Sequence, residues 1–270
     1  MITVSKFPDL QVAIPAGEPN IELRGAIIGT GQILNVSQPN GIGNQSGMTI
    51  IHGGALRCAG VVADGFRRLK FKELELYAEG NGITMRNGIQ LYLEDVYDCC
   101  HGDSLVLESI AAVWGRGLQH TAAVSGQSTV GQRIGASAQG FESVDMDAIL
   151  TEGHYSAVRV GGTGNSVNMW FRNYKIDRPV SAGFLINPSG SAGARNINII
   201  DPWINGADYP IAINGKETTG RIDRVNVRGG EYLGCGHVSG TNPVTLWTDT
   251  NNITCNVGGM PIIGPLELGS

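Results

Sequence analysis

Two aspartates, Asp145 and Asp147, stand two residues apart and alternate with the apolar Val144 and Met146. This alternation predicts a strand with one buried face, so both carboxylates are expected on its solvent side. Outward residues at i and i+2 of one strand lie about 6.6 Å apart. Inverting glycoside hydrolysis uses two carboxyl groups about 6.5–9.5 Å apart. The pair is therefore a candidate acid and base for glycosidic cleavage, and a solvated outer surface is the alternative.

A second acidic pair, Glu75 and Glu94, is expected at matching outward positions on consecutive repeats of the chain. Repeats stacked at about 4.8 Å would give these carboxylates the separation of about 5 Å that retaining hydrolysis uses. The alternatives are a dyad in which each charge perturbs the other and a solvated outer surface. The stretch 94–98 with His101 and Asp103 is the densest titratable cluster, and carboxylates with carbonyls can hold Ca²⁺. We predict no metal site and no cofactor, with Ca²⁺ at this cluster as the alternative.

Aromatic side chains suit sugar binding, because their flat faces match the apolar face of a pyranose. In the segment NMWFRNYKID we expect Met169 and Phe171 to point inward. The outer side then carries three candidate sugar-binding residues, and Trp203 follows at a corner that could extend the same surface. These candidates are Trp170, Arg172, Tyr174 and Trp203. The arginine suits the carboxylate of an acidic sugar, and packing against a neighbouring subunit is the alternative role.

The bulk composition excludes several classes of protein. Only 16% of the 270 residues are charged, the net charge is -5, and the one dense basic run, 67–72, alternates like a strand edge. A nucleic-acid partner is therefore not expected. No apolar run reaches the roughly 18 residues of a membrane span, and the first residues lack the apolar core of a signal peptide. Five scattered cysteines without a CxxC pair predict free thiols in a reducing compartment.

The elements that must position these residues are short strands. The 40 glycines are about twice the usual share of roughly 7%, and they disfavour helices. Alternating apolar segments recur at a spacing that approaches 28 residues in the second half, the size of one coil of a parallel β-helix. The expected inward residues are Leu74, Leu76, Leu91, Leu93, Val144, Met146, Met169, Phe171, Ile197, Ile199, Val225 and Val227. Glycine and asparagine are expected at the corners, where φ is often positive.

We therefore predict an all-β, right-handed parallel β-helix, or solenoid. Its expected boundaries are an N-terminal lead-in at 1–10, the β-helix at 11–236 and a C-terminal cap or tail at 237–270. A β-sandwich or jelly roll is the alternative, because several Asn-Gly pairs resemble hairpin turns.

The segment VAIPAGEPNIELRGAIIGTGQIL (12–34) resembles the opening coil of pectin-lyase-like right-handed β-helix proteins. The segments 196–215 and 221–236 are similar to later coils of that superfamily. Within it, the Gly- and Ser-rich style with low charge is most similar to bacteriophage tailspike and tail-fibre proteins. The resemblance implies a homotrimer that binds, and often cleaves, bacterial surface polysaccharide.

Three hypotheses about function follow. The first is a tailspike-like protein that binds bacterial surface polysaccharide, with Asp145 and Asp147 as the residues for hydrolysis. It would be made in the host cytoplasm without a signal peptide and would act on the virion, outside the cell. The second is a structural or receptor-binding virion component without enzymatic activity. The third is a cellular polysaccharide lyase or epimerase.

Overall fold

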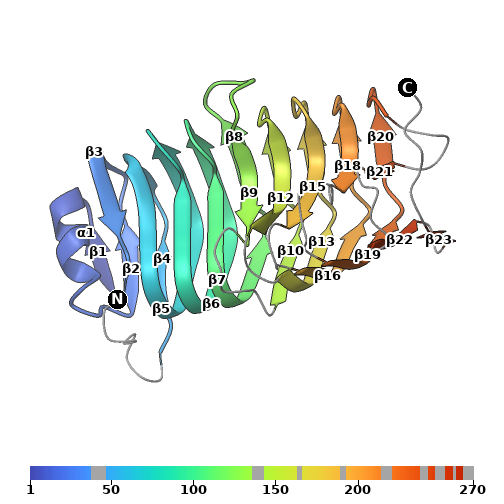
Figure 1. The fold of residues 1–270 in the computed structure, drawn as a ribbon. Coiled ribbons are helices and arrows are strands. Elements are labelled where there is room, and N and C mark those ends of the chain that lie inside the picture. Colours follow the sequence, from blue (N-terminus) through green and yellow to red (C-terminus); the bar gives the residue numbers. More distant parts are fainter. Residues whose placement is uncertain are drawn as a thin grey trace.

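The structure, a computed structural model, describes residues 1–37, 47–135, 143–162, 166–188, 193–213, 221–237, 243–246, 253–257 and 260–263. In these residues the chain winds into a parallel β-solenoid of about 7 turns. The coils stack along one axis, from the α1 end of the molecule to the β20 end (Figure 1). The prediction of an all-β parallel β-helix is confirmed.

Each coil contributes strands to up to three faces of the solenoid. The first face contains β1 (Ile2–Val4), β2 (Asn20–Leu23), β4 (Thr49–His52), β10 (Ser143–Asp147), β13 (Ser166–Arg172), β16 (Gly193–Ile200), β19 (Arg221–Arg228) and β22 (Ile253–Val257). The second face contains β8 (Gln119–Ala122), β11 (Leu150–Glu152), β14 (Lys175–Asp177), β17 (Trp203–Asn205) and β20 (Glu231–Leu233). The third face contains β9 (Val130–Ile134), β12 (Ser156–Gly162), β15 (Ala182–Pro188), β18 (Tyr209–Ile213) and β21 (Val244–Leu246).

Four long strands in the first half bend around corners and contribute to more than one face. They are β3 (Ala26–Asn35), β5 (Ala55–Ala78), β6 (Ile83–Cys100) and β7 (Leu105–Arg116). In the described residues every strand pairing is parallel except that of β22 with β23 (Met260–Ile263). Parallel pairing throughout the body rules out the alternative of a sandwich or jelly roll, which is built from antiparallel strands.

The interior is filled by the apolar side chains that alternate along each strand. All twelve residues predicted to point inward are buried, from Leu74 and Leu76 to Val225 and Val227. Parallel stacking places equivalent residues of successive coils above one another, so each coil covers the apolar layer of the next. The result is one continuous core along the axis.

The number of residues per coil changes along the molecule. On the first face Phe71 pairs with Leu93 and Leu93 with Gly115, a spacing of 22 residues. Further along, Phe171 pairs with Ile199 and Ile199 with Val227, a spacing of 28. The predicted period of 28 in the second half is therefore confirmed.

The corners use more residue types than predicted. Positive φ occurs at glycines and at Asn87 and Asn173, but also at Asp95, Ala148 and Arg178. Outside glycine this conformation is uncommon, and asparagine and aspartate adopt it most readily. Asp95, Ala148 and Asn173 each lie where the chain turns from the first face to the second.

The N-terminal end is covered by the short helix α1 (Phe7–Ala13), which buries Phe7, Leu10 and Ala13 (Figure 1). A Cβ at Gly29 would lie 2.4 Å from the Phe7 ring, so the glycine permits the helix to pack this closely. No helix in the described part of the chain has the length and apolarity needed to cross a bilayer.

Of the boundaries predicted from sequence, 10/11 falls within α1, and 236/237 falls between β20 and β21. Within the predicted lead-in, β1 pairs with β2. After residue 236, β21 pairs with β18 and β22 with β19. Coil pairing thus extends on both sides of the predicted range 11–236.

Candidate functional site

Two rows of outward side chains run along the first face, parallel to the solenoid axis. The register of the paired strands stacks one residue per coil in each row. The first row is Lys70, Tyr92, Trp114, Asp145, Trp170 and Asn198, and the second is Lys72, Glu94, Arg116, Asp147, Arg172 and Ile200. The rows bring together residues far apart in sequence that combine aromatic, acidic and basic groups.

The middle of these rows lines an open groove with a volume of about 350 Å³. Its walls include two aromatic side chains and six charged ones, which are Tyr92, Trp114, Lys70, Glu94, Arg116, Asp145, Asp147 and Arg172. A groove of this size with convergent polar groups is typical of a ligand-binding site.

The aromatic part of the groove is a stack of Tyr92 and Trp114. Their ring centroids are 4.6 Å apart and the planes differ by only 10°. One face of the Trp114 ring is covered by Tyr92, and the opposite face lies toward the coil that carries Asp145. In register, Asp145 lies between Trp114 and Trp170. An apolar platform therefore lies directly beside a carboxylate.

Tyr92 and Trp114 were not among the residues predicted from sequence. The signal that could have found them is their position, the outward place between two inward residues, repeated 22 residues apart. Finding it requires the shorter coil length of the first half, whereas the repeat recognised from sequence was the 28-residue spacing of the second.

The predicted orientation of Asp145 and Asp147 agrees with the structure. Both side chains are partly exposed, while Val144 and Met146, with which they alternate, are fully buried. Asp145 forms an ion pair with Arg172 of the next coil. Asp147 accepts a hydrogen bond of 2.7 Å from the side-chain amide of Asn173. Each carboxylate therefore already has a protein partner.

The predicted alignment of Glu75 with Glu94 is wrong. Glu75 pairs with Tyr97, and Glu94 pairs with Lys72 and Arg116. The corner at Asp95 separates the two glutamates, so Glu94 lies on the first face and Glu75 is exposed on the second. Glu94 forms an ion pair with Lys70, and this hydrogen-bonded lysine lowers the pKa of the Glu94 carboxyl.

The predicted aromatic surface is correct for two of its four residues. Trp170 and Arg172 lie on the outer side of β13 and are partly exposed. Tyr174 is buried instead, because Asn173 has a φ of 53° and turns the chain at a corner, which interrupts the strand alternation. Trp203 lies in β17 on the second face, where the amine of Lys175 is 5.3 Å from its ring centroid. It therefore does not extend the surface of Trp170.

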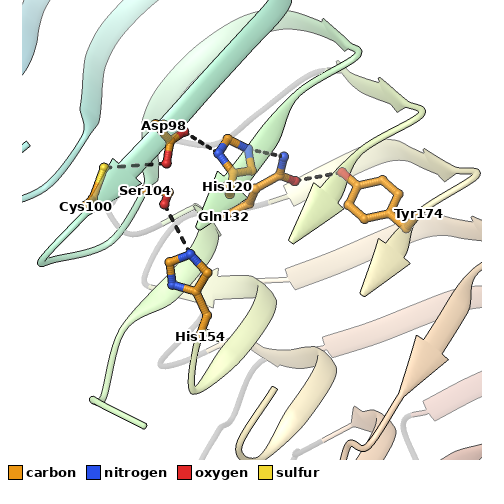
Figure 2. Close-up of polar contacts among 7 residues, drawn as sticks. All are labelled: Asp98, Cys100, Ser104, His120, Gln132, His154 and Tyr174. Atoms are coloured by element: carbon orange, nitrogen blue, oxygen red, sulfur yellow. Dashed lines mark hydrogen bonds and ion pairs between the residues drawn. The ribbon is translucent and has the colours of Figure 1, made fainter. Parts of the chain in front are cut away.

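Tyr174 belongs to a chain of buried polar side chains inside the solenoid (Figure 2). Its hydroxyl donates to Gln132 Oε1 at 2.7 Å, Gln132 Nε2 lies 3.0 Å from His120 Nε2, and His120 Nδ1 lies 2.5 Å from Asp98 Oδ2. Because the amide nitrogen can only donate, His120 Nε2 accepts and Nδ1–H donates to Asp98. The chain is therefore internally satisfied, and burial raises the pKa of the Tyr174 hydroxyl.

A second buried histidine, His154, lies between two hydroxyls. Its Nε2 is 3.2 Å from Ser104 Oγ and its Nδ1 is 3.1 Å from Thr129 Oγ1. Burial, with a smaller contribution from His120, lowers the pKa of His154 to about 4. Both histidines lie below 3% exposure, so these polar groups belong to the core and do not reach a substrate in the groove.

The cluster considered for Ca²⁺ does not converge. Glu94 points outward on the first face, Asp95 occupies an exposed corner, and Asp98 points into the core. Asp103 accepts hydrogen bonds from the backbone of Val130 and from Arg133. In the part of the chain that the structure describes, no group of three His, Cys, Asp or Glu side chains is arranged to hold a metal ion.

Comparison of the sequence with models of known protein families gives no match, and comparison with curated proteins gives none either. The fold and the groove therefore define the chain as a parallel β-solenoid with a solvent-open groove on its first face.

Proposed function

We propose that this chain binds polysaccharide along the outer side of its first face. The observation that carries the proposal is the Tyr92–Trp114 stack beside Asp145 and Asp147 in an open groove. Aromatic faces pack against the C–H faces of sugar rings, and the surrounding charged groups offer strong hydrogen bonds to hydroxyls. The rows repeat at about 4.8 Å per coil, so the groove presents an extended surface that suits a polymer.

In its fuller form the proposal is a tailspike-like protein that binds bacterial surface polysaccharide on a virion. Its support is the resemblance of 12–34 and of the later coils to pectin-lyase-like β-helix proteins, the Gly- and Ser-rich, low-charge style that is similar to tailspike proteins, and the β-helix fold. The groove supports this proposal, because its aromatic stack and charged side chains suit the binding of a glycan.

The binding test is the substitution Trp114→Ala, measured by affinity electrophoresis against a panel of purified bacterial surface polysaccharides. Loss of the aromatic face should weaken binding about tenfold or more, because burial of a large apolar side chain contributes about 1.5–3 kcal/mol. Trp203→Ala is the matched control, since that tryptophan lies on the second face and should leave binding unchanged. Equal loss in both variants, or in neither, contradicts the proposed groove.

The proposal of cleavage by Asp145 and Asp147 is tested separately by release of reducing ends from a bound polysaccharide. Hydrolysis by this pair predicts that Asp145→Asn with Asp147→Asn abolishes the release while binding persists. Unchanged release in the double variant removes these residues as acid and base. Unsaturated, ultraviolet-absorbing products would instead identify a lyase.

A binding protein without enzymatic activity is the second candidate. It is favoured by the partners of the two carboxylates, since Asp145 is paired with Arg172 and Asp147 with Asn173. This candidate predicts binding that depends on Trp114 and no bond cleavage in the wild-type protein.

A further inference from the structure

The charges of the groove balance one another. Its lining contains three cationic side chains and three carboxylates, which are Lys70, Arg116, Arg172, Glu94, Asp145 and Asp147. Two of the cations are already in ion pairs, Lys70 with Glu94 and Arg172 with Asp145. The charge of each is therefore already offset by a carboxylate of the protein.

The third cation, Arg116, has carboxylates on both sides. The strand register places it opposite Glu94 of the preceding coil and opposite Asp147 of the following coil. Paired strands lie about 4.8 Å apart, so both acidic residues neighbour Arg116, and besides the larger effect of Lys70, the charge of Arg116 helps to lower the pKa of the Glu94 carboxyl. An anion that approached Arg116 would also approach these two negative groups.

Arg172 was the residue predicted from sequence to bind an acidic sugar. Its ion pair with Asp145 uses the guanidinium that such a sugar would need. An acidic ligand would have to displace Asp145 and leave that carboxylate beside a second negative charge, which is unfavourable.

We infer that the groove selects an uncharged polysaccharide and disfavours polymers that carry carboxylate or sulfate groups. This inference rests on the proposed function and specifies its ligand class. Hydroxyl groups can accept from Lys70, Arg116 and Arg172 and can donate to Glu94, Asp145 and Asp147 without breaking the charge balance. The aromatic stack supplies the apolar contact.

The first test compares acidic bacterial polysaccharides with the same polymers after chemical reduction of their carboxyl groups, alongside neutral polysaccharides. Retention in affinity electrophoresis should favour the neutral and reduced forms and change less than about twofold between about 50 and 300 mM salt. Preference for the acidic form, lost on reduction and dependent on Trp114, overturns the inference while leaving the proposed function in place. Absence of Trp114-dependent binding to any polymer overturns the proposed function itself.

A second test uses dextran sulfate as the probe and needs no knowledge of the natural ligand. Asp147→Asn gives the groove a net positive charge, so low-salt binding of dextran sulfate should rise at least about fivefold and fall again on adding salt. Glu75→Gln removes the same charge from an exposed site on the second face and is the matched control. If the wild type binds dextran sulfate as strongly as Asp147→Asn does, the inference that the charges of the groove balance is contradicted.

Discussion

At the scale of single residues, the interior of the solenoid is not purely apolar. Asp98, His120, Gln132 and Tyr174 are all buried and joined in one hydrogen-bonded chain (Figure 2). Buried polar groups are tolerated only when they are satisfied, because an unpartnered group costs about 1–3 kcal/mol. The chain links β6, β8, β9 and the corner before β14, so it fixes the relative positions of several coils.

His154 makes the stability of the fold depend on pH. Its pKa is lowered to about 4 in the folded protein, against about 6.5 in an unfolded chain. The unfolded state therefore binds more protons between pH 6.5 and 4, so stability is full above pH 6.5 and falls as the pH drops toward 4. The loss from this residue should reach about 3 kcal/mol, measured as the free energy of unfolding in denaturant at each pH.

The substitution His154→Asn should flatten this pH dependence, because the titrating group is removed. His101→Asn is the control, since His101 is exposed at a turn and should leave the slope unchanged. A slope that is equal in the wild type and in His154→Asn would show that other groups cause the acid sensitivity.

Residue positions within a strand could be predicted from sequence, and positions beside a corner could not. Alternation alone placed Asp145 and Asp147 outward, because their neighbours Val144 and Met146 fill the core. The same rule was wrong for Tyr174, because a single positive φ at Asn173 reverses the side on which the next residue lies. Contacts between coils, such as Tyr92 with Trp114, depend on a register that alternation does not contain.

At the scale of elements, the corners determine where each face ends. A ladder of positive-φ residues follows the first face, with Asp95, Gly117, Ala148, Asn173 and Asp201 at equivalent places on successive coils. On each coil, the strand segment of the second face begins shortly after this residue. A residue with a Cβ is strained in this conformation by about 1–2 kcal/mol.

Among the five residues of this ladder, Ala148 is the one that is neither a glycine nor a residue whose polar side chain can form a local hydrogen bond. Its φ is 54° and its side chain is exposed. Ala148→Gly should therefore raise the free energy of unfolding by about 0.5–1 kcal/mol, since relief of strain exceeds the added entropy of the unfolded chain. Denaturant titration measures the change.

Ala157→Gly is the matched control, because Ala157 is a buried strand residue without positive φ. That variant should be destabilised, by loss of a methyl group from the core and by added chain entropy. Destabilisation of both variants by similar amounts would contradict corner strain at Ala148.

The strands and their period were predictable from sequence, because an apolar, inward-facing residue occupies every second position of each strand. Corners were predictable where they use glycine or asparagine. They were not predictable at Glu73, Ala148 or Arg178, whose residue types do not indicate positive φ. At these places the stacked neighbours impose the turn.

At the scale of the whole molecule, the homotrimer that the sequence resemblance implies would need a surface for association. Val124, Tyr155 and Val180 are between 41% and 43% exposed and occupy corresponding turns between the second and third faces. Backbone hydrogen bonds from Val180 to His154 and from Ser181 to Tyr155 place the latter two turns side by side. Exposed apolar groups gathered at one corner are typical of an interface.

We therefore expect light scattering after size exclusion to give three times the mass of one chain. Tyr155→Ser with Val180→Ser should shift the protein toward the monomer, because the apolar contact is lost. Val12→Ser is the control, since Val12 is 69% exposed but lies on α1 at the end of the solenoid. A monomeric wild-type protein contradicts the trimer.

The change from 22 to 28 residues per coil shows that the perimeter of a coil can change without a change in its rise along the axis. The outer rows remain in step across this change, so extra residues enlarge the perimeter of a coil and leave the rise along the axis at about 4.8 Å. Duplication of a coil would lengthen the groove by that increment, whereas insertion at a corner would leave its length unchanged. The length of the groove and the perimeter of the solenoid can thus vary independently during evolution or engineering.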